Sequence, residues 1–242
     1  MKSLKAQVAA ELRLTLRRGD SVLLNLAIPV GLLVFFSLVD VLPKPAAVVH
    51  PVTFLAPGLL ALAVMSTAMV SLGIATGFER QHGVLKRLGS TPLGRPRLLA
   101  AKIVSVGAVE VLQVAVLVVV ALLLGWGPGG PVALAVPAII LATVAFAGLG
   151  LLMAGALRAE VTLAAANGLY LALLLLGGMI FPLTRLPDGL RVLAEALPAG
   201  ALSDALHGSL SAGGAVPGRA WIVLAAWAVA APLAAALTFR WE

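Results

Sequence analysis

Apolar residues in this chain are grouped into six long stretches, and short segments rich in charged residues separate them. Runs of about 18 to 25 apolar residues match the length of a helix that crosses a hydrocarbon layer roughly 30 Å thick. The pattern therefore predicts six transmembrane helices in an all-α integral membrane protein. Their approximate bounds are 21–42, 52–78, 98–124, 132–157, 161–181 and 220–239.

Composition supports this prediction. Of the 242 residues, 61% are hydrophobic and 11% are charged, whereas soluble domains carry about 25% charged residues. A soluble core of this length could not bury so much apolar surface, but a bilayer solvates the outer faces of helices. The chain contains no cysteine, which excludes disulfides, thiolate zinc sites and thiol redox chemistry.

Charge predicts the orientation in the membrane. If the N-terminus is cytoplasmic, 13 of the 17 Lys and Arg residues lie on the cytoplasmic side of the predicted helices. This bias predicts that both termini are cytoplasmic. The net charge of +7 could suggest nucleic acid, but the basic residues form no stripe interleaved with aromatic residues, so we expect no nucleic-acid partner.

The N-terminal segment 1–19 has its own pattern. Leu4, Val8, Leu12 and Leu16 recur every four residues among basic side chains. This spacing predicts an amphipathic helix that lies in the membrane interface, and the alternative is a solvated basic leader. Residues 20–242 would then form one six-span transmembrane domain.

The predicted external segment 182–219 is too elaborate for a simple turn. Its apolar positions Leu190, Leu193, Ala194 and Leu197 share one helical face, and 201–210 forms a second short apolar piece; Gly177, Gly178 and Pro182 break the chain before them. Neither piece is long enough to span a bilayer, so we expect short re-entrant helices shielded by the other helices. The alternative is an ordinary external loop.

The residues for catalysis are missing. No Gly-Lys dipeptide is present, so the chain has no P-loop for ATP. His50, His82 and His207 occupy three separate connections, and we interpret them as surface histidines without a metal site. We predict no catalytic residue.

Few polar residues lie inside the predicted spans. Glu110 and Gln113, three residues apart, share one face of the third span, and Asn167 and Tyr170 lie in the fifth. An acidic side chain near mid-bilayer costs about 2.5 to 3.5 kcal/mol on insertion scales, so Glu110 should face protein or a water-filled cavity. These four residues are candidates for a substrate path; for Glu110 and Gln113 an interhelical hydrogen bond is an equal alternative.

Small residues indicate where helices approach closely. Gly73 and Gly77 are four residues apart, as are Gly150 and Ala154. This spacing lets two helix backbones pack against each other. Packing inside the chain is the first interpretation, and dimerisation is the alternative.

The predicted cytoplasmic loop 79–97 contains a short amphipathic helix. Val84, Leu85 and Leu88 fall on one face with basic residues around it. Such an apolar ridge with a charged rim is typical of a surface that inserts into a partner's groove. Thr91-Pro92 then ends the helix.

This loop resembles that of the permease subunits of ABC-2 type transporters. The resemblance rests on Glu79, Gly83, Leu85, Leu88, Thr91 and Pro92, with Val84 in place of the commoner Thr. The six spans, the N-terminal interfacial helix and the sequence Gly-Met-Ile-Phe-Pro at 178–182 also match the family.

The resemblance implies an exporter permease, in the branch linked to drug or antibiotic resistance, that works with a separate nucleotide-binding ATPase subunit and a second permease, identical or paralogous. Val84 to Leu88 would be the coupling helix, and Gly177, Gly178 and Pro182 would belong to an external gate. The partner would bind ATP and Mg, so we expect no cofactor on this chain.

The expected location is a bacterial plasma membrane, in contact with its lipids, and the expected substrate is lipid-like or amphipathic and drug-like. Polysaccharide and haem-pathway permeases share this topology. A membrane-embedded lipid-modifying enzyme and an ion-driven carrier are the alternatives outside the family.

Overall fold

The computed structural model describes residues 19–39, 51–89, 95–180, 183 and 186–239. Every element in these residues is helical, which confirms the all-α fold. In chain order the elements are α2 (Gly19–Leu38), α3 (Pro51–Met65), the π-helix η1 (Ser66–Ser71), α4 (Leu72–Gln81), α5 (Val84–Gly89), α6 (Arg95–Leu123), the 3-10 turn η2 (Val132–Leu134), α7 (Ala135–Ala156), α8 (Ala159–Leu176), α9 (Asp188–Ala196), α10 (Pro198–Leu210) and α11 (Gly218–Thr238).

The long helices follow the predicted spans closely. Within the described residues, five helical stretches are long and apolar enough to cross a membrane: Pro51–Gln81, Arg97–Leu123, Val132–Ala156, Ala159–Leu176 and Gly218–Thr238. The first of these joins α3, η1 and α4. α2 occupies the remaining predicted span, but its apolar stretch Asn25–Leu38 is shorter than the other five, so the count of six stays a prediction. The interfacial helix predicted for 1–19 lies almost entirely outside the described residues.

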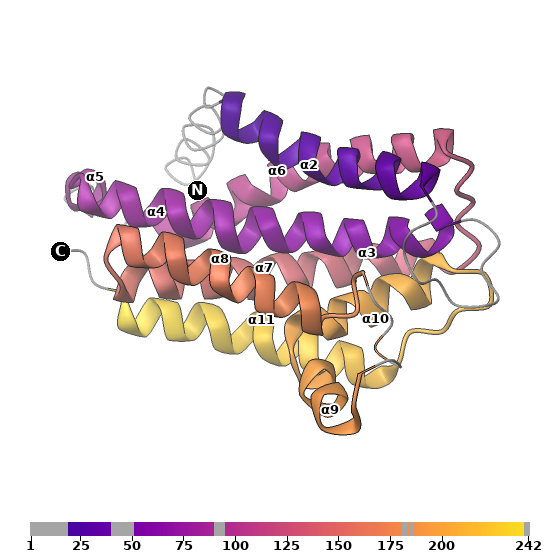
Figure 1. Cartoon of the computed structure of the whole chain (residues 1–242). Coiled ribbons are helices and arrows are strands. Elements are labelled where there is room, and N and C mark those ends of the chain that lie inside the picture. Colours follow the sequence, from indigo (N-terminus) through magenta and orange to yellow (C-terminus); the bar gives the residue numbers. More distant parts are fainter. Residues whose placement is uncertain (1–18, 40–50, 90–94, 181–182, 184–185, 240–242) are drawn as a thin grey trace.

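The long helices form one bundle with two different ends (Figure 1). α5 extends from α4 at one end, where α8 begins and α11 finishes, while α10 lies toward the opposite end. α7 is central because it packs against α4, η1, α10 and α11.

Glycines let α7 approach its neighbours without intervening side chains. A Cβ added to Gly150 would lie 2.5 Å from the carbonyl oxygen of Met69, and one added to Gly73 would lie 3.1 Å from the carbonyl oxygen of Gly150. On its other side, a Cβ on Gly148 would lie 2.5 Å from the nitrogen of Pro232 in α11. The predicted packing role of Gly73 and Gly150 within the chain is therefore confirmed.

The fifth span is shorter than predicted. α8 ends at Leu176 rather than near 181, because Gly177 occupies its C-cap and Gly178 turns the chain with a positive φ of 69°. α9 and α10 follow as the two short helices predicted from the sequence.

α9 and α10 differ in burial. α10 is buried along nearly its whole length between α3, α7 and α11. On α9, the predicted apolar face is mostly uncovered, because Leu190 and Leu193 are exposed and Ala194 alone of the helix is buried.

The interpretation of His207 as a surface residue is wrong. His207 lies on α10 and its side chain is mostly enclosed. Its Nδ1 lies 2.9 Å from the carbonyl oxygen of Ser203, and its Nε2 lies 3.1 Å from that of Phe54. The ring also packs against Phe54 in α3. His82 is exposed as predicted, and His50 lies outside the described residues.

One glycine in α3 provides a sharp test of this packing. A Cβ on Gly58 would lie 1.9 Å from the carbonyl oxygen of Met179, so Gly58→Ala must displace the segment after α8. We expect a loss of about 1 to 3 kcal/mol in the free energy of unfolding, measured by thermal or denaturant unfolding in detergent. Gly107→Ala in α6, where an added Cβ meets nothing within 4 Å, is the matched control; equal stability of the two variants would contradict the packing.

Candidate functional site

The loop after α4 contains the predicted short helix, but the helix buries part of the face that was predicted to be exposed. Gly83 has a positive φ of 70°, a conformation that glycine adopts without strain, and it turns the chain from α4 into α5. Leu85 is 0% exposed and belongs to the chain's own core, whereas Val84 is 40% exposed. The predicted ridge is therefore corrected: Val84, not Leu85, is available to a partner, because Leu85 packs into the core of the chain itself. Leu88 lies in α5, and Thr91 and Pro92 lie outside the described residues.

Glu79 makes an ion pair at the base of this loop. Its Oε2 accepts a hydrogen bond from Lys102 Nζ at 2.5 Å, and the Lys102 side chain is only 2% exposed. A buried ammonium requires a nearby counter-charge. The glutamate of the loop pattern thus connects the end of α4 to α6.

Gln113 supplies a hydrogen-bond donor that α2 lacks. Pro29 lies inside that helix and has no N–H, so the carbonyl of Asn25, four residues earlier, lacks its usual donor. Gln113 Nε2 donates to this carbonyl oxygen at 2.7 Å. The side chain of α6 replaces the donor that proline removed, as membrane helices require.

The same polar cluster includes the π-helix. Thr67 Oγ1 donates to Gln113 Oε1 at 2.8 Å, and Asn25 Nδ2 donates to Ser71 Oγ at 2.8 Å. Thr67 and Ser71 belong to η1, at the middle of the long second span. The cluster therefore joins α2, η1 and α6 near the centre of the bundle.

Glu110 lies one turn from Gln113 and is 2% exposed. Its Oε2 is hydrogen-bonded to Thr143 Oγ1 of α7, and Thr143 Oγ1 also lies 2.9 Å from the carbonyl oxygen of Ile139. Because the Thr143 hydroxyl carries one proton, it can donate to only one of these two oxygens at a time. Glu110 Oε1 is buried without a hydrogen-bond partner among the described residues.

The other two candidates for a substrate path lie elsewhere. Asn167 is exposed on α8, with Nδ2 bonded to its own helix at Leu163 O, 2.8 Å away, and Tyr170 is half-buried. The structure brings Glu110 and Gln113 into interhelical contacts but does not bring Asn167 or Tyr170 to them.

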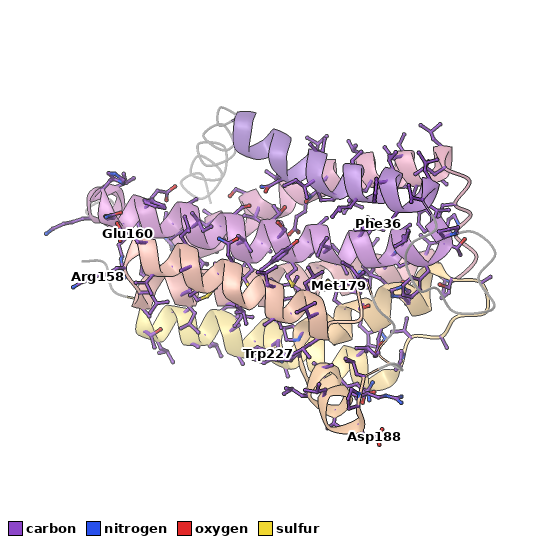
Figure 2. The ribbon with its side chains drawn as sticks, viewed as in Figure 1. Phe36, Arg158, Glu160, Met179, Asp188 and Trp227 are labelled. Atoms are coloured by element: carbon purple, nitrogen blue, oxygen red, sulfur yellow. The ribbon has the colours of Figure 1, made fainter. Side chains whose placement is uncertain are left out.

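The predicted external gate packs on two helices. Ser203 Oγ of α10 donates to the carbonyl oxygen of Gly178 at 3.0 Å. The next residue, Met179, is buried inside the bundle, where it contacts Gly58 of α3 (Figure 2). Gly177 would clash with Ala199 if it had a side chain, since an added Cβ would lie 2.9 Å from that residue's Cβ. Pro182 lies outside the described residues.

Charged side chains tie the short helices to α11. Arg219 binds both Glu195 of α9 and Asp204 of α10, and Arg191 Nε lies 2.9 Å from Glu195 Oε1. The hydrogen bond from Arg191 is the main cause that lowers the pKa of Glu195 below its usual value, and both arginine charges act in the same direction. Burial raises the pKa of Asp204 and lowers that of His207, because each charged form loses solvation.

Sequence reasoning missed several residues of the polar cluster. Asn25, Thr67, Ser71 and Thr143 each carry a polar group in an apolar stretch, but their partners come from other helices. Pro29 was the available signal, because a proline inside a span predicts a carbonyl that some neighbour must bind. Among the described residues, no group of three or more His, Asp or Glu side chains could hold a metal ion.

The bond between η1 and α6 can be tested with matched threonines. Thr67→Val leaves Gln113 Oε1 buried without its donor, so the free energy of unfolding should fall by about 0.6 to 1.7 kcal/mol. Thr238→Val removes only a bond to the same helix, to Ala234 O, at an exposed position, and should change little. Unfolding in SDS or by steric trapping measures both; equal effects would show that the interhelical bond contributes nothing.

Comparison with known proteins supplies the family. The model of the ABC-2 type transporter family matches residues 2–210. The chain is 26% identical over 200 residues to a protein of Bacillus subtilis (strain 168) named "Putative transport permease YvfS", covering 82% of this chain and 81% of that protein. The matched region includes the polar cluster, the α4–α5 turn and α10. This multi-pass membrane chain therefore belongs to the ABC-2 type transporter family.

Proposed function

We propose that the chain is the permease subunit of an ABC exporter, in which a separate nucleotide-binding subunit hydrolyses ATP. The observation that carries this proposal is the position of α5, within a family of transporter components. α5 continues the second long helix at one end of the bundle (Figure 1) and exposes Val84 there. A displacement of α5 would act on a helix that crosses the whole bundle. The partner would bind ATP and Mg, and this chain would have no cofactor or ATPase site.

The proposed substrate is a lipid-like or amphipathic, drug-like molecule, moved from the cytoplasm or the inner leaflet. Inside the bundle, polar side chains such as Gln113 and Thr67 are bound to each other. The spanning helices present exposed apolar residues outward, among them Val111, Leu123 and Ile222. This distribution suits a substrate that shares the apolar environment. Resistance to drugs or antibiotics is the proposed physiological role.

A second permease would complete the transporter, against an exposed face of α8. Asn167 lies there, beside Ala164, Gly168 and Ala172, which are also exposed. Asn167 Nδ2 is bonded within its own helix, but lipid tails offer no donor to the amide oxygen, whereas a second helix does. Small residues four apart also let two helices approach closely. We also propose that the α5 end faces the cytoplasm of a bacterial cell; the excess of Lys and Arg predicted for that side supports this orientation.

Purification from the native host tests the permease proposal. Tagged chain, solubilised in mild detergent and analysed by mass spectrometry, should carry a P-loop ATPase in stoichiometric amount. Val84→Asp should reduce the retained ATPase by about tenfold or more, because burying an unpaired carboxylate costs more than the roughly 1.4 kcal/mol of a tenfold change.

The control is Ala156→Asp, which adds the same charge at an exposed position of the same bundle end and should retain the ATPase. Leu85 is unsuitable as a probe because it is buried. Absence of any ATPase from the unaltered chain would overturn the proposal.

Cross-linking tests the α8 face. The chain has no cysteine, so Gly168→Cys introduces a single thiol at a position where an added Cβ meets nothing within 4 Å. If two copies meet here, oxidation should give a disulfide-linked dimer, which requires Cα atoms within about 7 Å. Val229→Cys, exposed on α11, should remain monomeric; the reverse result would place the second copy elsewhere.

A further inference from the structure

The last three residues of α4 bind three other helices, although the family loop pattern includes only the first of them, Glu79. Glu79, Arg80 and Gln81 are consecutive, and two residues after Gln81 the chain turns at Gly83 into α5. Successive side chains on a helix point about 100° apart, so three neighbours in sequence can reach three different elements. We call Glu79-Arg80-Gln81 the α4 terminal triplet.

Glu79 binds α6. The ion pair with Lys102, 2.5 Å long, lies where the Lys102 side chain is 2% exposed and that of Glu79 is 15% exposed. A pair so shielded from water is screened little by salt. The pair therefore holds the end of α4 against α6.

Arg80 binds the end of α7. Its guanidinium donates from Nη1 to the carbonyl oxygen of Gly155 at 2.5 Å and from Nη2 to that of Leu157. α7 ends at Ala156, so both carbonyls belong to a helix terminus that lacks intrahelical donors. A cation at the carboxyl end of a helix also interacts favourably with the helix dipole. The planar guanidinium holds one donor toward each oxygen in a fixed geometry, whereas the ammonium of lysine is a single compact group on a flexible chain.

Gln81 binds the beginning of α8. Its Nε2 donates to Glu160 Oε1 at 2.8 Å in the first turn of that helix. Figure 2 shows Glu160 and Arg158 at the same end of the bundle as α5. The α7–α8 junction is thus held by Arg80 on one side and Gln81 on the other.

We propose that the α4 terminal triplet transmits movement of α5 to α6, α7 and α8, with Arg80 as the positioning residue that holds the α7–α8 junction. This inference rests on the proposed function, because it assumes that a partner ATPase moves α5. Without the triplet, a displacement of α5 would be passed on by the second span alone. With it, the displacement reaches α8, at whose far end lie Gly177 and the segment packed on α3.

Spin-label distances in the complete complex test the proposal without knowledge of the substrate. The chain contains no cysteine, so exposed residues can be labelled as cysteine pairs. One pair, at Lys86 and Leu237, reports α5 against the adjacent end of α11, and Lys86 is exposed on a different face of α5 from Val84; the other, at Leu175 and Ile222, reports the far end of α8 against α11. Distances are measured without nucleotide and with ATP plus vanadate.

In the otherwise unaltered chain, nucleotide should change both distances. In Arg80→Gln, the change at α5 should persist, while the population that changes at the far end of α8 should fall on the order of 2- to 30-fold. His82→Ala is the matched control, since His82 is exposed, bonds to Phe78 O of its own helix, and should leave both changes intact. If Arg80→Gln fails to accumulate, Arg80→Lys keeps the charge but replaces two donors of fixed geometry with one flexible ammonium, and a reduction in the same direction is expected.

Three results are decisive against the proposal. A full change at α8 in either Arg80 variant would show that the triplet is a static brace. A response at α5 alone in the unaltered chain would show that no movement reaches α8. If neither distance responds and no ATPase accompanies the chain, the proposed function itself fails, and the inference fails with it.

Discussion

The whole bundle depends on the pairing of backbone groups inside the membrane, and the hydrogen bond from Gln113 to the backbone carbonyl of Asn25 is the clearest example. A bilayer supplies no water to a carbonyl whose donor is missing, so each such group must find a partner inside the protein. Pro29 creates the missing donor in α2, and α6 supplies the replacement. Because Gln113 also binds Thr67, one side chain connects three helices at the centre of the bundle. The ends of other helices obey the same constraint: Arg80 binds the last carbonyls of α7, and Trp227 Nε1 donates to Ala196 O at the end of α9.

The positions of the helices could be predicted because the bilayer fixes their length and each helix satisfies its own backbone. The two short helices before α11 were equally predictable, since prolines and glycines break the apolar pattern there. The face that a short helix buries could not be predicted, because it depends on neighbours distant in sequence. Leu85 and Val84 are adjacent on the predicted ridge, yet the first is buried in the chain and the second is exposed. His207 was mistaken for a surface residue for the same reason, since its partner Phe54 is 153 positions away.

The intramembrane polar residues divide into two groups by their partners. Gln113 has its hydrogen-bonding groups occupied by other helices, so its role in holding the bundle explains its presence. Glu110 differs, because Thr143 binds only one of its carboxyl oxygens and the other has no partner within the described part of the chain. Sequence alone could place both residues on one helical face, but it could not separate them, because the distinction depends on which groups the other helices present.

The packing around α7 differs from the exposed contacts at the two ends of the bundle, and this difference bears on how the bundle could move. Around α7, Gly150 and Gly148 bring backbones into direct contact with η1 and α11, and such packing cannot slide gradually because interiors are close-packed. At the ends, exposed ion pairs and hydrogen bonds also join the helices, such as Arg219 with Glu195 and Gln81 with Glu160. These groups can exchange partners with water at low net cost. A transporter needs at least two arrangements of similar free energy, and the exchangeable contacts lie where a partner or the aqueous phase can reach them. The rigid centre would then carry a change made at one end to the other.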